Sequence, residues 1–393
     1  MKRVMTLCLL LVTFSSVAFA QRFTDKLDRG VVAVPASGGS GYLVSWRIFG
    51  EEYYGVTYNL YANGSRIATN LKVSNYTHSG GNASTRYQVA AVVNGQEQQL
   101  SNAATPWTSG YYQFPVANVV DRSGKDVTDS YIINDISLGD VDGDGVTEFL
   151  VKRNTTLGAN NPSNTTSYHH YEMYKLDGTR LWWIDMGPNM IAGPDEQWDI
   201  VMNDWDEDGK AECILRGADN MIIHFGDGTT MRVGSTADTR WSGMEYTSSG
   251  NEYLLYLEGA TGKPYNISGN ENQPWINYPL PRGNDSDWGT GIVGHRSTKH
   301  YFGAPYLDGR HASIFLGRGC YTKHHFKAFD VDPQTHKLTQ RWEWSATSGP
   351  YFGNGYHNFS IADVDEDGRD EIAFGSMVID DNGMSKAYSS MPG

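Results

Sequence analysis

An acidic segment of nine residues occurs three times in this chain of 393 residues, and it constrains the fold more than any other feature. It spans 140–148, 204–212 and 363–371, and each copy reads Asp-x-Asp-x-Asp-Gly-x-x-Glu. Short apolar runs flank every copy, as in "FSIADVDEDGRDEIAF". Such runs are typical of β-strands. The repeats therefore predict strand–loop–strand units in which four carboxylates crowd into one turn.

The spacing of these carboxylates predicts metal loops. Side chains at the first, third and fifth positions converge, and a carbonyl at the seventh and the carboxylate at the ninth complete an oxygen cage that suits Ca²⁺. An EF-hand would need Glu at the twelfth position and a helix on each side. A metal-free Asp/Gly-rich turn is the alternative for one copy, but three copies favour calcium. The predicted ligands are Asp140, Asp142, Asp144, Glu148, Asp204, Asp206, Asp208, Glu212, Asp363, Asp365, Asp367 and Glu371.

The three loops also explain the charge of the chain. They carry −4, −4 and −5, which is −13 of the formal net charge of −14. Acidic clusters that are not neutralised repel themselves and destabilise a compact state. The acidity therefore belongs to the loops and is no evidence for a cationic partner, and we expect no nucleic-acid partner.

The N-terminus predicts export. "MKRVMTLCLLLVTFSSVAFA" has a basic start, a short apolar core and Ala-Phe-Ala, which is typical of a signal peptide (1–20) cleaved after Ala20. Its apolar run is too short to span a bilayer, and no later segment approaches that length. We expect a periplasmic or extracellular, soluble monomer. The sequence leaves open whether Cys213 and Cys320 pair.

Composition and turn signals indicate an all-β chain with two domains. The chain has 24 Tyr, 11 Trp and 44 Gly, and turn signals recur about every ten residues. Residues 22–106 predict a small sandwich of the fibronectin type III kind. Its "YLVSWRIFG" alternates, and Asn-Gly pairs predict two hairpin turns. One predicted face carries Val44, Trp46 and Ile48, and the turns lie at Asn63–Gly64 and Asn94–Gly95.

Residues 107–393 repeat an acidic loop, several strands and a hairpin such as "YKLDGTRLWWID". Units of 40–60 residues with this content predict the blades of a calcium-binding β-propeller. About four blades fit into the chain.

Several longer motifs carry a family resemblance. They are "RGVVAVP", "NDISLGDVDGDGVTE" (134–148), "YKLDGTRLW" (174–182), "RGNDSDWG" (282–289), "GRGCYTK" (317–323) and the segment 353–383. With them the chain resembles the family 11 polysaccharide lyases, the bacterial rhamnogalacturonan lyases, through nearly all of its length after the leader. The resemblance implies a fibronectin-like domain, an eight-bladed propeller with several calcium ions and an active cleft across the propeller face. It also implies that about half of the blades are present, so we expect a C-terminally truncated chain.

The resemblance implies cleavage of rhamnogalacturonan I of pectin by β-elimination at galacturonate. This reaction needs a cation on the uronate carboxylate, a base for the C5 proton and an acid for the leaving oxygen. Local positive charge must bind such an acidic glycan. The candidates are, for catalysis, Arg318, Tyr321, Lys323 and His357, and, for substrate binding, Asn134, Lys152, Arg282 and Asn358.

Alternatives remain open for these residues and for the chain. A basic side chain can instead form a structural salt link, and His357 can be a satisfied buried side chain. The chain itself can be a non-catalytic calcium propeller for glycan binding or adhesion, or an inactive fragment of a lyase. Endo or exo action, the exact glycan and the catalytic base are not determined by the sequence.

Overall fold

A computed structural model describes residues 22–24, 26–52, 55–191, 200–289, 291–346, 348–349, 351–353 and 355–388. The predicted signal peptide (1–20) lies outside the described residues. Within them the regular structure consists of β-strands and three short 3₁₀ turns, with no α-helix. The predicted all-β class is thereby confirmed. The 3₁₀ turns are η1 (Gly50–Glu52), η2 (Thr128–Ser130) and η3 (Asp285–Trp288).

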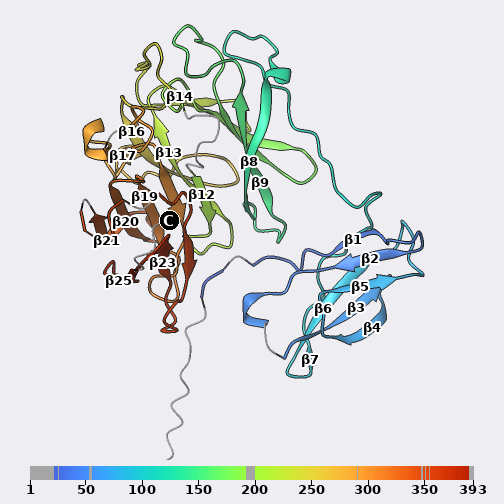
Figure 1. Cartoon of the computed structure of the whole chain (residues 1–393). Helices are drawn as coiled ribbons and strands as arrows, with labels where there is room; N and C mark the ends of the chain where they lie inside the picture. Colours follow the sequence, from blue (N-terminus) through green and yellow to red (C-terminus); the bar gives the residue numbers. More distant parts are fainter. Residues whose placement is uncertain are drawn as a thin grey trace, which may run out of the picture.

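The N-terminal part is a β-sandwich, drawn in blue and cyan in Figure 1. Its three-stranded sheet has the order β1-β2-β5, and its four-stranded sheet has the order β4-β3-β6-β7, with every pair antiparallel. Buried side chains of both sheets, among them Val44, Leu60 and Tyr87, form one core. The strands are β1 (Val32–Pro35), β2 (Tyr42–Ser45), β3 (Thr57–Ala62), β4 (Ser65–Leu71), β5 (Asn75–His78), β6 (Tyr87–Val93) and β7 (Gln96–Glu97).

Both predicted hairpins of the sandwich are confirmed. Asn63 and Asn94 have φ of 50° and 51°, and each is followed by a glycine that also has positive φ, as two-residue hairpin loops require. Val44 and Trp46 are both buried, but Ile48, which the alternation predicts on the same face, is 51% exposed. Strand β2 ends at Ser45, so the alternation of the strand does not extend to Ile48.

Among the described residues, the C-terminal part contains four antiparallel sheets, of which the first two interleave along the chain (Figure 1). The first has the order β15-β14-β11-β10-β9-β8, and the others have the orders β12-β13-β16-β17, β18-β19-β20-β21 and β22-β23-β24-β25.

The first two of these sheets share the chain between Tyr131 and Asn277. The strands of the first are β8 (Tyr131–Gly139), β9 (Glu148–Thr155), β10 (His170–Tyr174), β11 (Arg180–Asp185), β14 (Met221–His224) and β15 (Thr230–Val233). Those of the second are β12 (Ile200–Asn203), β13 (Glu212–Ala218), β16 (Glu252–Leu257) and β17 (Ile276–Asn277).

The third and fourth sheets follow in simple sequence order. The third contains β18 (His300–Gly303), β19 (Ile314–Arg318), β20 (His324–Val331) and β21 (Leu338–Ala346). The fourth contains β22 (Ser360–Ala362), β23 (Glu371–Phe374), β24 (Met377–Ile379) and β25 (Ser385–Tyr388).

The core of this part lies between consecutive sheets. Strand β13 is buried on both faces, because Leu215 packs in a cluster with the first sheet while Ile214 packs in a cluster with the third. Strand β19 repeats the pattern, since Leu316 packs toward the second sheet and Phe315 toward the fourth. Successive side chains of a strand point to opposite faces. The sheets are therefore stacked face to face in the order of the chain.

Candidate functional site: an acidic end and a histidine end of the stacked sheets

Each acidic loop connects the first two strands of a sheet. The loops 140–148, 204–212 and 363–371 join β8 to β9, β12 to β13 and β22 to β23. In every case the final glutamate begins the second strand and pairs with the residue just before the first aspartate. The pairs are Gly139↔Glu148, Asn203↔Glu212 and Ala362↔Glu371. This register explains why the glutamate stands at the ninth position, since closure of the hairpin returns it to the first aspartate.

The three loops also share their backbone hydrogen bonds. The first aspartate accepts an N–H from the glycine at the sixth position, at 2.7 Å for Asp140, 3.0 Å for Asp204 and 2.9 Å for Asp363. The final glutamate accepts an N–H from the second residue of the loop, at 2.9 Å, 2.8 Å and 2.6 Å in the same order. The glycines have φ between 85° and 92°, which a side chain would disfavour.

The loops bring most, but not all, of the predicted ligands together. One carboxylate oxygen from each of Asp204, Asp206, Asp208 and Glu212 lies within 4.8 Å of the others. The first and third loops bring three carboxylates together in the same way: Asp140, Asp142 and Glu148, and Asp363, Asp365 and Glu371. Asp144 and Asp367 are not part of these sets and accept the N–H groups of Val146 and Arg369.

The electrostatics of the loops fit a divalent cation. Burial, together with the neighbouring aspartates, raises the pKa of Glu148 to about 7 and that of Glu212 to about 9. Asp142 Oδ1 and Glu371 Oε1 are buried and have no hydrogen-bond partner among the described residues. Buried oxygens normally have one. An all-oxygen donor set with such atoms is what Ca²⁺ prefers, so these residues fit the predicted metal.

The three loops form one continuous region, which we call the acidic end. The first two touch, because Ala211 donates its N–H to the carbonyl of Asp140 at 2.7 Å. The N-terminal segment before the sandwich crosses the same region. Arg22 pairs with Asp370 of the third loop at 2.9 Å, and Asp28 donates its N–H to the carbonyl of Gly145 at 2.9 Å.

The other ends of the strands carry tyrosine and histidine, and we call this region the histidine end. Tyr321 lies in the β19–β20 turn and His357 precedes β22, and Tyr321 Oη is 2.7 Å from His357 Nε2. The ring of His295 stacks on Tyr321 at 6.2 Å and contacts Tyr246 at 4.8 Å. The Arg296 guanidinium lies 5.6 Å from the centre of the Tyr321 ring. These five residues define the histidine end.

The two imidazoles at this end are held neutral. Partial desolvation, followed by the nearby charge of Lys299, lowers the pKa of both His295 and His357. A neutral imidazole can accept a proton, and it can do so through the phenol that it contacts. Two of the predicted catalytic residues, Tyr321 and His357, therefore lie together and exposed at the surface, with the predicted substrate residue Asn358 beside them.

Two further predicted residues lie in a buried ion cluster instead. Arg318 is fully buried and donates from Nη2 to both oxygens of Glu252 at 2.6 and 2.8 Å, while Arg282 lies 2.8 Å from the same carboxylate. Arg216 adds a third guanidinium at 3.1 Å. Although burial acts to raise it, these cations, Arg318 foremost, hold the pKa of Glu252 far below its usual range. The sequence left two roles open for Arg318 and Arg282, a functional contact with the substrate or a structural salt link. The geometry favours the structural salt link.

The remaining predicted residues are dispersed. Lys323 places its ammonium 4.8 Å from the ring of Trp288. Lys152 is buried within β9, and Asn134 is exposed on β8, the free edge strand of the first sheet. Cys213 and Cys320 are buried thiols. Among the described residues, no helix is long and apolar enough to cross a membrane.

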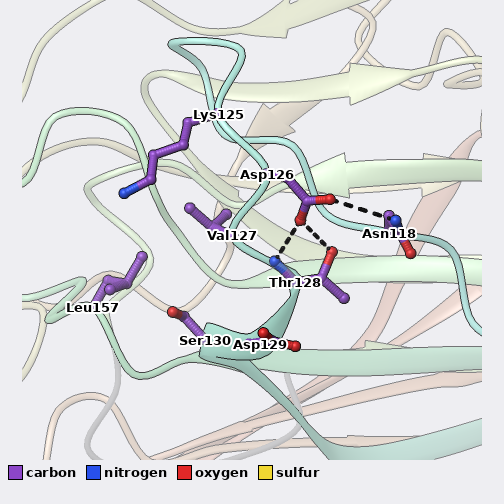
Figure 2. Close-up of a pocket in the computed structure, with 8 residues that line it drawn as sticks. All are labelled: Asn118, Lys125, Asp126, Val127, Thr128, Asp129, Ser130 and Leu157. Atoms are coloured by element: carbon purple, nitrogen blue, oxygen red, sulfur yellow. Dashed lines mark hydrogen bonds between the residues drawn. The ribbon is translucent and has the colours of Figure 1, made fainter.

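Two of the surface depressions among the described residues lie beside the first sheet. One of them, with a volume of about 420 Å³, is drawn in Figure 2. The carboxylate of Asp126 in it accepts hydrogen bonds from Thr128 and Asn118. The other, of about 370 Å³, lies beside the histidine end and includes Tyr246. Its lining residues are Ile132, Asn154, Thr155, Thr156, Gly158, Ala159, Asn160, His169, Glu245 and Tyr246.

Sequence reasoning missed Tyr246, His295 and Arg296, and it missed Glu252 and Arg216 of the buried ion cluster. A signal for two of them was present in "GHRSTKHY" (294–301), where four basic or imidazole side chains occur within six residues. Glu252 had no such signal, because its three arginines come from positions 30 to 66 residues away.

Comparisons with known proteins agree with this arrangement. The family model described as the C-terminal domain of rhamnogalacturonan lyase family 11 matches residues 111–392, and the model of the β-sheet domain of rhamnogalacturonan I lyases matches residues 22–107.

Two curated proteins of Bacillus subtilis (strain 168) are similar to the chain. Rhamnogalacturonan endolyase YesW is 38% identical over 391 residues, covering 96% of this chain and 60% of that protein. Rhamnogalacturonan exolyase YesX is 34% identical over 379 residues, covering 92% of this chain and 58% of that protein. The chain thus spans about 60% of the length of these relatives.

Solved structures give the same result. The crystal structure of rhamnogalacturonan lyase YesW superposes with a TM-score of 0.78 at 36% identity, over 95% of this chain and 62% of that one. The family 11 rhamnogalacturonan lyase of Bacillus licheniformis gives a TM-score of 0.77 at 34% identity, over 94% of this chain and 62% of that one. The match of one family model to well over half of the residues shows that the chain belongs to the family 11 rhamnogalacturonan lyases.

Proposed function

We propose that this chain is a secreted, calcium-dependent lyase that cleaves rhamnogalacturonan I by β-elimination at galacturonate. Family membership and the names of the two curated relatives support this proposal. The observation that carries it is the contact of 2.7 Å between Tyr321 Oη and a neutral His357 at an exposed end of the stacked sheets. The predicted leader (1–20) would direct export, and we expect a monomer.

We further propose that the four stacked sheets are blades of a β-propeller, in a domain of residues 107–393 that follows a fibronectin-like sandwich of residues 22–106. Four antiparallel sheets in chain order support this architecture, which closes when further blades join the first to the last. Four large apolar side chains on the free strand β8 are between 44% and 56% exposed, as expected of a strand that faces further blades. They are Ile132, Ile133, Ile136 and Leu138.

The histidine end offers the groups that elimination needs. His357 Nε2 takes the phenolic proton as Tyr321 Oη takes the proton from C5 of the galacturonate. The electron pair of the C5–H bond forms the C4–C5 double bond, and the C4–O bond breaks. The imidazolium of His357 can then return its proton to the leaving oxygen, so that protons and electrons balance. The Arg296 guanidinium is placed to stabilise the negative charge that develops on the uronate.

The calcium loops have a separate task. They lie at the opposite ends of the strands from Tyr321 and His357, since β22 alone separates His357 from the third loop. Ca²⁺ bound there would supply positive charge to the loops themselves. Neutralisation of the substrate carboxylate falls to Arg296.

The test is the ultraviolet absorbance of the unsaturated uronate when the chain is mixed with rhamnogalacturonan I. We expect growth of this signal, and a loss of about 10²–10⁴-fold in rate for His357→Ala and Tyr321→Phe. His78→Ala is the matched control, because His78 makes the same kind of contact, 3.0 Å from Tyr87 Oη, in the sandwich. Glycan binding without absorbance would support the non-catalytic alternative. Product lengths would distinguish endo from exo action.

A further inference from the structure

Each acidic loop has a basic side chain against its third-position aspartate. In the first loop, the ammonium of Lys175 contacts Asp142 Oδ2. In the third, the ammonium of Lys386 contacts Asp365 Oδ2 and lies 2.8 Å from Asp380 Oδ1. In the second, the partner of Asp206 is the imidazole of His336, at 3.0 Å.

These partners do not come from the repeated motif. Lys175 belongs to the β10–β11 turn of the first sheet, and Lys386 belongs to β25, the last strand of the fourth. His336 reaches the second loop from the β20–β21 turn of the neighbouring third sheet. Three unrelated backbone positions thus deliver a nitrogen to the same carboxylate of the motif. Such agreement indicates that this carboxylate requires a partner.

The group that meets the third-position aspartate is an ammonium in the first and third loops and an imidazole in the second. Lys175 donates to Asp142, and Lys386 donates to both Asp365 and Asp380. Each ammonium binds an aspartate that belongs to a converging set of three carboxylates. The second loop has four converging carboxylates, and among the residues that the structure describes no lysine contacts Asp206.

We propose that Lys175 and Lys386 are built-in counter-ions that hold the first and third loops together without metal and compete with Ca²⁺ for Asp142 and Asp365. This rests on the calcium binding in the proposed function. Affinity for Ca²⁺ depends on the charge of the ligand set, and an ammonium subtracts from that charge. The loop 204–212 is therefore the tight site, and the loops 140–148 and 363–371 bind at least about tenfold more weakly.

The lysines leave part of each site available to the metal. Asp142 Oδ1 and Glu371 Oε1 are buried and have no hydrogen-bond partner among the described residues. Each ammonium contacts one oxygen of the third-position aspartate, Asp142 Oδ2 or Asp365 Oδ2. Within the described part of the chain, it does not contact the other loop oxygens that a coordinated ion would bind. A lysine that moves aside on metal binding explains both the contact and the unsatisfied oxygens.

Calorimetric titration of the chelator-stripped full chain with Ca²⁺ tests the proposal, with Lys175→Met and Lys386→Met as the variants. We expect one tight and two weaker sites in the wild type, and a gain of about tenfold at one weaker site in each variant. Thermal unfolding adds an independent signature. Without calcium the variants should melt below the wild type, whereas the rise in melting temperature caused by calcium should be larger. Lys175→Gln and Lys386→Gln repeat the measurement with a polar side chain.

Lys210→Met is the matched control. Lys210 lies 3.5 Å from Asp208 of the second loop, and both side chains are about half exposed, so its loss removes the same charge from a solvated pair. We expect a change of less than about twofold at the second site. An equal gain for Lys210→Met, or a lower melting temperature with and without calcium in the Lys175 and Lys386 variants, would overturn the proposal.

The result also separates this inference from the proposed function. A wild type that binds calcium while the lysine variants bind it no better overturns only the inference. If neither wild type nor variants bind calcium at millimolar concentration, calcium dependence and the inference both fall, and the absorbance assay still decides whether the chain is a lyase.

Discussion

The two ends of the stacked sheets neutralise concentrated charge differently. At the acidic end, the three loops carry −13, and Lys175 and Lys386 contact one aspartate each in two of them. Near the histidine end, the single carboxylate of Glu252 is surrounded by the guanidinium groups of Arg216, Arg282 and Arg318. The chain supplies the counter-charge itself at Glu252 and leaves most of it to a ligand in the loops.

The difference separates stability from chemistry. A loop that relies on a ligand for its charge balance becomes dependent on calcium concentration. A buried carboxylate whose counter-charge comes from the chain itself needs no metal, so the end near Glu252 can hold Tyr321 and His357 in position without one. Four experiments test how far this separation extends.

Calcium removal should have the largest effect. Each site that is saturated at a hundredfold excess over its Kd adds about 2.7 kcal/mol to the free energy of unfolding, so three sites add about 8 kcal/mol. The urea midpoint of the stacked sheets should fall strongly with a chelator, while that of the sandwich does not change. Tryptophan fluorescence and circular dichroism follow the two parts. Equal losses in both parts would contradict the separation.

Glu252→Gln should have the next largest effect. It leaves three buried guanidiniums without their carboxylate, and breaking a buried ion pair costs about 3–5 kcal/mol. Since the pKa of Glu252 is lower in the folded than in the unfolded chain, its contribution is complete above about pH 4.3 and is lost as pH falls further. The variant should therefore be less stable than the wild type at pH 7, and its free energy of unfolding should fall less steeply than that of the wild type below about pH 4.3. The control is Glu97→Gln, which removes an exposed carboxylate of the sandwich.

His169 should make the histidine end sensitive to acid. Burial, followed by the charge of Lys152, lowers its pKa to about 3, and its Nδ1 accepts the N–H of Thr155 at 3.2 Å. A lowered histidine pKa gives stability that is complete above about pH 6.5 and declines as pH falls toward 3. His169→Gln should flatten the loss of melting temperature between pH 7 and pH 5. His311→Gln, at a half-exposed histidine, should not.

The smallest effect should come from a hydroxyl in the sandwich. Tyr87→Phe removes a contact with His78 like that between Tyr321 and His357, and it should cost about 1 kcal/mol of sandwich stability. Activity should be unchanged, whereas Tyr321→Phe should cost activity and no stability. A Tyr87→Phe variant that loses activity would show that the sandwich takes part in catalysis.

The repeated motif was the strongest predictor in the sequence. Asp-x-Asp-x-Asp-Gly-x-x-Glu with flanking apolar runs predicted three β-hairpins, and the Asn-Gly pairs predicted two more, because hydrogen bonding and backbone geometry within a few residues decide such units. The prediction that Ile48 shares a face with Val44 and Trp46 failed for an equally local reason. The alternation there is real, but the strand ends at Ser45, and the sequence does not mark that end.

The candidate site was only partly predictable. Arg318 has the glycine-rich surroundings of a substrate-binding residue, yet its neighbour in space is Glu252, 66 residues earlier in the chain. His357 and Tyr321 were chosen separately, and only the fold of the third and fourth sheets brings them into contact. Contacts between distant residues depend on how sheets stack, and no local pattern encodes that.

The sequence alone therefore determined the all-β class, the strand–loop–strand units and the residues able to bind a hard cation, since these follow from local spacing. The tertiary structure decided that the counter-charge of Glu252 comes from the chain itself, and that Lys175 and Lys386 contact aspartates of the acidic loops. It also decided that the acidic end and the histidine end lie at opposite ends of the strands. These features depend on long-range packing, in which a side chain's partner is set by the stacking of sheets and not by its neighbours in sequence.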